Sequence, residues 1–103
     1  MTSWHECLST LDQLANLERG WNGPESKAPQ PGQITAAWRF LRCMQLIRAD
    51  FPKAVTLSDD GTVIIEWWDH FIRFRLETIT ASLFEVTLVK MGECADYFQV
   101  QSK

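Results

Sequence analysis

The side chains closest to a metal-ligand spacing in this sequence are His5 and Cys7. Imidazole nitrogen and thiolate sulfur are donors that zinc prefers. Residues two positions apart point to different sides of a helix, so this pair is a poor start for a metal site. His70 stands alone, and Cys43 and Cys94 are far from any CxxC arrangement. We therefore expect no bound metal and three reduced thiols, as is usual in a cytoplasm.

Cys43 and the pair Asp59 and Asp60 are the remaining candidates for catalysis. A cysteine nucleophile needs a base within reach, and the predicted helix around Cys43 offers no identifiable partner. Paired carboxylates can share acid and base roles, but Asp-Asp-Gly is typical of a turn because aspartate side chains bind nearby backbone amides. The sequence has neither a glycine-rich phosphate loop before a helix nor a serine elbow. We predict that the protein is not an enzyme and uses no cofactor.

The composition indicates one globular domain spanning residues 1–103. A hydrophobic content of 46%, with five tryptophans, supplies enough apolar surface for a core without metal or disulfide. The net charge is only -3, whereas nucleic-acid binders usually carry a basic stripe and mimics of nucleic acid are much more acidic. No stretch approaches the roughly 20 apolar residues of a membrane span, and no signal peptide is recognisable. We expect a cytoplasmic protein without membrane contact.

Two amphipathic helices are predicted in the first half of the chain. In the first, apolar residues recur every three or four positions, at Trp4, Cys7, Leu8, Leu11, Leu14 and Leu17. Ser3 and Glu6 fit a capping box and Gly20 suits the left-handed position after a last turn, so this helix should run from Ser3 to Arg19. The second stripe comprises Ile34, Ala37, Trp38, Leu41, Met44 and Ile47. That helix must stop before Pro52.

From residue 54 onward the hydrophobic period changes to two, which is typical of strands. The segments 54–57 and 62–68 flank a Ser-Asp-Asp-Gly turn and predict a hairpin, and segment 71–77 follows after only Asp69 and His70. The segments 83–90 and 96–101 complete an antiparallel meander of four to five strands. The predicted fold class is α+β in the order ααβββββ, with both helices packed on one face of the sheet.

The alternation assigns the strand residues to two faces. A two-residue loop at 69–70 would place Glu66 opposite Arg73, and Glu85 should lie opposite Arg75. The helix side then takes Val63, Ile65, Trp67, Ile72, Phe74, Leu76, Phe84, Val86 and Leu88. The other side, which we call the outward sheet face, carries Glu66, Trp68, Phe71, Arg73, Arg75 and Glu85, with Ile64, Leu83 and Val89 beside them. The sequence thus predicts a ladder of paired glutamates and arginines across this face, bordered by apolar side chains.

The loop 20–32 joins the two predicted helices and combines prolines with one large ring, Trp21. Prolines reduce the freedom of the unfolded chain. A hydrophobic residue just after a helix-ending glycine commonly folds back onto the last turn. We therefore expect Gly20, Trp21, Gly23 and Pro29 to be structural, with the Trp21 ring closing one end of the core rather than stacking on a ligand.

Several of these residues form a pattern that resembles a widespread group of small bacterial and phage-borne proteins. The recurring marks of that group are a Gly-Trp-Asp/Asn-Gly loop, a later Asp-Gly and a Glu-Trp strand. The matching positions are Gly20, Trp21, Asn22, Gly23, Pro29, Pro52, Asp60, Gly61, Glu66 and Trp67, within residues 11–77. The tail after Leu83 lies outside the pattern. The resemblance implies the two-layer architecture and an origin in a bacterium or a mobile element, and it implies no catalytic residue.

The outward sheet face is the predicted binding surface, because exposed aromatic rings beside arginines are typical of interface cores. We hypothesise a protein-binding module, such as a phage or mobile-element inhibitor of a host defence complex, of the anti-CRISPR kind, or of another host enzyme. An antitoxin or immunity-type partner protein has the same physical requirements, and a homodimer through this face stays open. A nucleic-acid-binding domain is the least favoured alternative. It would use Arg39, Arg42, Arg48 and Lys53 around the second helix.

Overall fold

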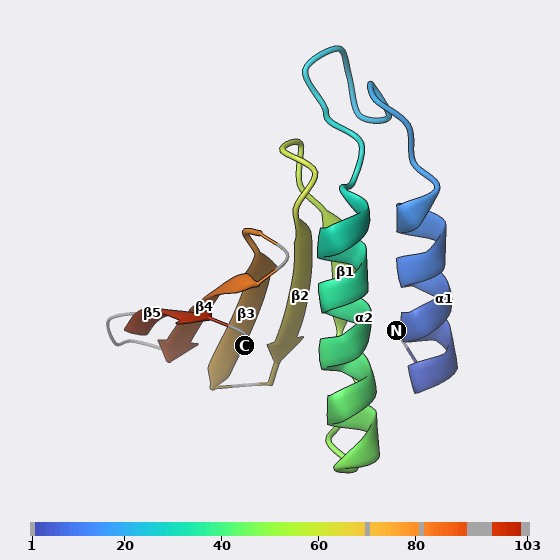
Figure 1. Ribbon diagram of the computed structural model, residues 1–103. Helices are drawn as coiled ribbons and strands as arrows, with labels where there is room; N and C mark the ends of the chain where they lie inside the picture. Colours follow the sequence, from blue (N-terminus) through green and yellow to red (C-terminus); the bar gives the residue numbers. More distant parts are fainter. Residues whose placement is uncertain (1, 70, 81, 91–95, 102–103) are drawn as a thin grey trace.

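The computed structural model describes residues 2–69, 71–80, 82–90 and 96–101. His70 and Cys94 lie outside these residues, as does the side chain of Val89. The elements along the chain (Figure 1) are α1 (Trp4–Ala15), α2 (Pro31–Leu46), β1 (Ala54–Leu57), β2 (Val63–Trp68), β3 (Ile72–Thr78), β4 (Leu83–Lys90) and β5 (Asp96–Gln101). The five strands form one antiparallel sheet in the order of the sequence. The predicted α+β fold is therefore confirmed.

Helix α1 begins as predicted and ends earlier. The Ser3 hydroxyl accepts a hydrogen bond from the Glu6 amide at 3.1 Å, but the Glu6 carboxylate binds the amide and hydroxyl of Thr2, so only half of a capping box forms. These bonds from Thr2 lower the pKa of Glu6. The helix stops at Ala15 because Asn16, whose side-chain amide donates to the Asp12 carbonyl, serves as its C-cap.

The predicted helix end at Arg19 is thus wrong. Gly20 was predicted to follow the last turn of this helix, and it does not. Its φ is indeed positive, at +84°, but it lies well beyond the helix. The Gly20 amide donates to the Ser26 carbonyl at 2.9 Å and closes the loop that follows. A side chain that binds its own helix competes with helix propagation, and this competition was not apparent from the apolar stripe.

Helix α2 has Pro31 in its first turn and ends at Leu46. Its buried residues are Gln33, Ala36, Ala37 and Leu41. Two members of the predicted core stripe are instead exposed, Trp38 by 40% and Ile47 by 72%. The small Ala36 and Ala37 side chains face the core, which turns the neighbouring Trp38 toward solvent. Ile47 lies beyond the last helical residue and so does not continue the stripe.

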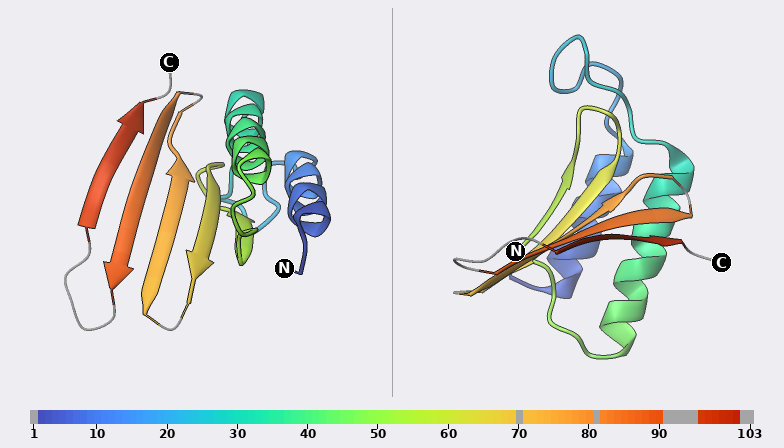
Figure 2. Two further views of the ribbon diagram at one scale, coloured as in Figure 1. Left: turned by 90° about the horizontal axis from the view of Figure 1, so that it is seen from below. Right: turned by 90° about the vertical axis from the view of Figure 1, so that its left-hand side faces the viewer.

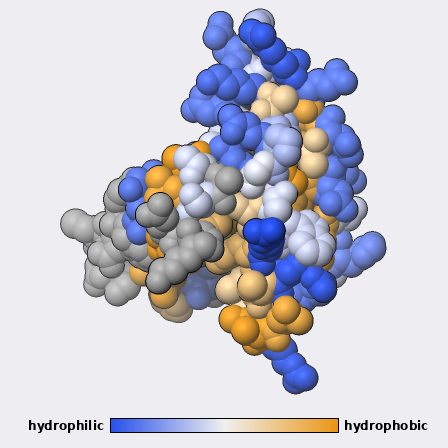
Figure 3. All heavy atoms as spheres, viewed as in Figure 1, coloured by the Kyte–Doolittle hydropathy of each residue, from blue (hydrophilic) through white to orange (hydrophobic). Residues whose placement is uncertain are grey.

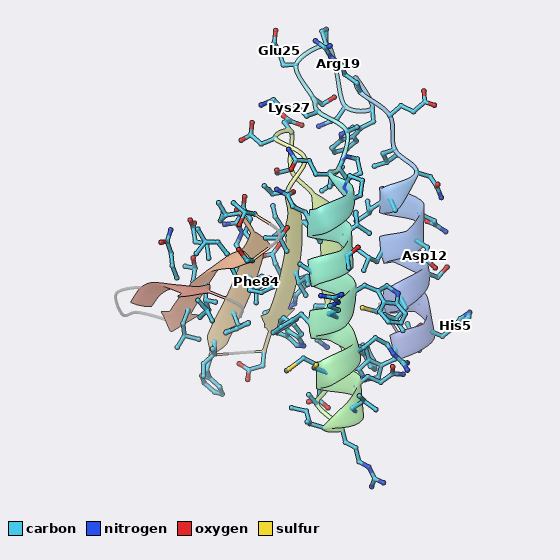
Figure 4. All side chains as sticks on the ribbon, in the orientation of Figure 1. His5, Asp12, Arg19, Glu25, Lys27 and Phe84 are labelled. Carbon is cyan, nitrogen blue, oxygen red and sulfur yellow. The ribbon has the colours of Figure 1, made fainter. Side chains whose placement is uncertain are left out.

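The helices lie side by side next to β1 and β2, and β5 forms the far edge of the sheet (Figure 2). The predicted helix side of the sheet supplies Val63, Ile65, Leu76, Phe84 and Val86 to the buried core, and Trp67 and Phe74 pack against it. Phe84 points from β4 toward α2 (Figure 4), where its ring lies 6.1 Å from that of Phe40. Ile72, the first residue of β3, is exposed rather than buried.

The strand register differs from the prediction by two residues. Glu66 lies opposite Arg75, and Trp68 lies opposite Arg73. The cause is the turn: the Asp69 carboxylate accepts hydrogen bonds from the amides of Phe71 and Ile72, at 2.7 and 2.9 Å, which lengthens the connection. A slip of two residues leaves every side chain on its predicted face.

The β3–β4 pairing is shifted in the same way. Arg75 lies opposite Thr87 and Glu77 opposite Glu85, so the predicted pairing of Glu85 with Arg75 is wrong. Here the Thr80 hydroxyl accepts a hydrogen bond from the Leu83 amide at 3.0 Å and shapes the turn. In both hairpins a short polar side chain that binds turn amides has set the register.

The loop between the helices packs against the turn between β1 and β2. The Lys27 amide donates to the Asp59 carbonyl at 2.7 Å, and the Asn22 side chain donates to the Asp59 carboxylate at 3.0 Å. Trp21 packs against the core cluster, and its indole N–H donates to the Lys27 carbonyl at 2.9 Å. The Gly-Trp-Asn-Gly loop and the Asp-Asp-Gly turn, far apart in sequence, therefore form one structural unit.

Candidate interaction surface

Among the described residues that suggested metal or thiol chemistry, His5, Cys7 and Cys43 are not brought together. His5 is exposed and projects from α1 away from the sheet (Figure 4), whereas Cys7 is fully buried and Cys43 is exposed on α2. Within the part of the chain that the structure describes, no three His, Cys, Asp or Glu side chains are grouped to hold a metal ion. Among the same residues, no helix has the length and apolarity that crossing a bilayer requires.

The two described cysteines should differ sharply in reactivity. Burial raises the pKa of the Cys7 thiol to about 11, so this thiol stays protonated at pH 8. Because the thiolate is the reactive form, we expect iodoacetamide at pH 8 to modify Cys7 at least about 100-fold more slowly than exposed Cys43. Peptide mass spectrometry over time measures both rates. In denaturant the rates should converge; similar rates in the native protein would contradict the buried position of Cys7.

The outward sheet face is organised around an ion pair between Arg73 on β3 and Glu66 on β2. The Arg73 guanidinium approaches one Glu66 carboxylate oxygen through two nitrogens, Nη2 at 2.8 Å and Nε at 3.0 Å. The Glu66 side chain is only 15% exposed and that of Arg73 is 58% exposed. The sequence predicted that these two residues would meet directly across the strands; they meet diagonally, since Arg75 occupies the opposite position.

Trp68 completes this cluster from the position opposite Arg73. The Arg73 guanidinium lies 5.5 Å from the centre of the Trp68 ring, within the range of a cation–π contact. Trp68 is nevertheless 43% exposed, and Phe71, in the adjoining turn, is 68% exposed. The cluster therefore presents two aromatic rings and an arginine to solvent, with the arginine held in position by Glu66.

The rest of the predicted ladder is rearranged. Arg75 pairs with Glu77 of its own strand at 3.1 Å, and Glu77 also accepts a hydrogen bond from the Thr62 hydroxyl at 2.7 Å. Glu85 lies opposite Glu77, a like-charge neighbour. Glu85 is thus separated from the aromatic cluster, which consists of Glu66, Trp68, Phe71 and Arg73.

A hollow of about 390 Å³ adjoins the cluster at the end of the sheet. Trp68 and Asp69 line it from the cluster side, and Trp67, Ile72 and Phe74 line it from the helix side. Further lining comes from the segment after α2, at Asp50, Phe51 and Lys53. The hollow therefore adjoins the cluster at Trp68.

A second aromatic and arginine pair lies on α2 and was missed in the sequence. The Arg42 guanidinium lies 5.3 Å from the centre of the exposed Trp38 ring, and Arg42 donates to the Gln45 side chain at 2.7 Å. Their i, i+4 spacing could have indicated this contact. The apolar stripe of α2 predicts a core position for Trp38 instead, which hides this contact. Arg39, another residue of the predicted basic edge, is exposed.

Comparison with protein-family models, with curated proteins and with solved structures finds no match to this chain. The geometry of the surface therefore carries the functional argument.

Proposed function

We propose that the chain is a small protein-binding module that acts in the cytoplasm, where its cysteines stay reduced, and that the cluster of Glu66, Trp68, Phe71 and Arg73 contacts the partner. The observation that carries this proposal is the exposed Trp68 ring held against a prepositioned arginine. Tryptophan and arginine are the residues most enriched among interface hot spots. The ion pair with Glu66 restricts Arg73 before binding, which reduces the entropy that association costs.

The charges on this face favour a protein partner over a nucleic acid. The described part of the outward sheet face alternates arginines with Glu66, Glu77 and Glu85. Phosphates would be repelled by these carboxylates, whereas a protein surface can supply both signs of charge. Because the chain resembles phage-borne proteins, the first role to test is inhibition of a host defence complex or of another host enzyme. That complex or enzyme would be the partner. An antitoxin or immunity role would use the same surface.

The double variant Trp68→Ala/Arg73→Glu tests the surface. We expect it to weaken binding of the captured partner by at least about 2 kcal/mol, the loss typical of interface anchors. The partner is first captured from the host with the unaltered protein and identified by mass spectrometry, and affinities are then measured by calorimetry. Thermal unfolding of each variant checks that the fold is kept.

The matched control is Trp38→Ala/Arg42→Glu, which removes the same pair of residue types from α2. It should bind the partner normally. If the α2 variant loses binding and the sheet variant does not, the interaction surface lies on α2 and the proposal is wrong.

A further inference from the structure

The end of α2 carries an apolar protrusion. Leu46 and Ile47 are 74% and 72% exposed, more than any other large hydrophobic side chain that the structure describes. Figure 3 shows apolar atoms gathered at this lower end of the helix. Single exposed apolar residues are ordinary, but two adjacent ones at a protruding helix end form a patch that binding can bury.

Arg48, the next residue, has a backbone conformation that suits glycine. Its φ is +62°, and no other non-glycine residue that the structure describes has a positive φ. The Arg48 and Ala49 amides donate to the carbonyls of Gln45 and Met44, at 3.1 and 3.0 Å, which is the Schellman pattern of a helix end. An arginine at this position strains the backbone. Because the backbone gains nothing from arginine at this position, a role of the Arg48 side chain would account for the residue.

An apolar pocket lies beside this protrusion. It has a volume of about 270 Å³ and is lined by Phe40, Met44, Ala49, Asp50, Trp67 and Phe74. This volume falls below the roughly 300–1,000 Å³ of small-molecule sites, so the pocket suits an aliphatic side chain better than a metabolite. Asp50 is the one charged residue of the lining, and its side chain is exposed.

The aromatic wall of the pocket is held in place by contacts within the chain. The Trp67 ring packs edge-on against Phe40 at 6.0 Å and against Phe74 at 5.5 Å. Its indole N–H donates to the Asp50 carbonyl at 3.0 Å, which ties the Asp50 backbone to the sheet. A preformed pocket loses little conformational entropy when it is filled.

We propose that this chain forms a two-fold dimer in which Leu46 or Ile47 of each copy enters the apolar pocket of the other, and Arg48 of each copy pairs with Asp50 of the other. The protrusion offers two aliphatic side chains followed by an arginine. The pocket offers an apolar lining with one carboxylate, so the two surfaces are complementary in polarity and in charge. Met44 and Ala49 flank the protrusion and also line the pocket, so the two patches are adjacent. Adjacent complementary patches allow a closed, self-complementary two-fold contact.

Charge reversal tests this pairing between copies. Arg48→Asp alone and Asp50→Arg alone each place like charges across the dimer, and each should raise the dimer dissociation constant at least about tenfold. Mixing the two variants should restore dimers of near-normal affinity, because each contact then joins an aspartate to an arginine. Sedimentation velocity across a concentration series measures all four samples, including the unaltered protein. A monomeric unaltered protein, or no recovery on mixing, would overturn the proposal.

Two further variants separate association from folding. Arg48→Gly relieves the positive φ, so at a concentration where both proteins are monomeric it should melt no lower than the unaltered protein, while at higher concentration its dimer is weaker. Trp68→Ala/Arg73→Glu should still dimerise, because neither Trp68 nor Arg73 lines the proposed pocket. A monomeric Trp68→Ala/Arg73→Glu variant would place self-association on the outward sheet face and overturn this inference. The proposed function would still be judged separately, by the affinity for the partner.

Discussion

Trp67→Ala is expected to lower the free energy of unfolding by about 3 kcal/mol or more, at the lower end of the losses seen for aromatic truncations in cores. Trp67 packs against Phe40 and Phe74 and donates a hydrogen bond to the Asp50 carbonyl. Removing the ring leaves a cavity between α2 and the sheet and leaves that carbonyl without its indole donor. Equilibrium unfolding in urea gives the change directly.

The neighbouring residue provides a matched control. Trp68 has the same side chain, one position along the strand, on the opposite face of the sheet. Trp68→Ala loses mainly an exposed contact with Arg73 and should cost about 1 kcal/mol or less. Equal losses for the two variants would show that the face assignment of β2 is wrong.

Gly61→Ala is expected to destabilise the fold by about 2 to 4 kcal/mol, the sum of a left-handed backbone penalty and an overpacking cost. Gly61 has a φ of +83°, and a Cβ atom there would lie 2.6 Å from the Ala28 carbonyl oxygen. The loop 20–32 and the β1–β2 turn would have to separate. Hydrogen bonds that Asp59 accepts from Lys27 and Asn22 would be lost with that movement.

Gly23→Ala isolates the steric part of this effect. Gly23 also has a positive φ, +108°, but a Cβ atom there would meet nothing within 4 Å. It should therefore show a backbone penalty alone, about 1 to 2 kcal/mol. Thermal unfolding of both variants measures the difference. If Gly61→Ala costs no more than Gly23→Ala, the contact between the loop and the turn is looser than the structure indicates.

The faces of the sheet could be predicted from the sequence, whereas the register could not. Alternation places Trp67 and Trp68 on opposite faces whatever the pairing, so the packing of Trp67 against the core and the exposure of Trp68 follow from the pattern alone. Which glutamate meets which arginine depends on the turns. Asp69 and Thr80 bind turn amides and shift both hairpins by two residues, and this gave Arg75 a partner in Glu77 instead of Glu85.

The helices show the same limit. Apolar spacing located both helices, but Asn16 ended the first one early through a bond to its own backbone. The Trp38 ring belongs to the periodic stripe and still faces solvent, because the helix presents its alanines to the core. The pocket beside α2 had no sequence signal, since its lining comes from α2, the segment after it and two strands.

The order of strands in the sheet has a consequence for how the chain folds. Each strand pairs with the one before it, so every hairpin closes only a short loop and costs little chain entropy. The helices are different, because α1 packs on β1, and α2 packs on β2 and β3. During synthesis both helices leave the ribosome before any strand that can cover their apolar faces. We therefore expect docking of the helical pair onto the first three strands to limit the folding rate, so mutations at the contacts of α1 with β1, and of α2 with β2 and β3, should slow folding most.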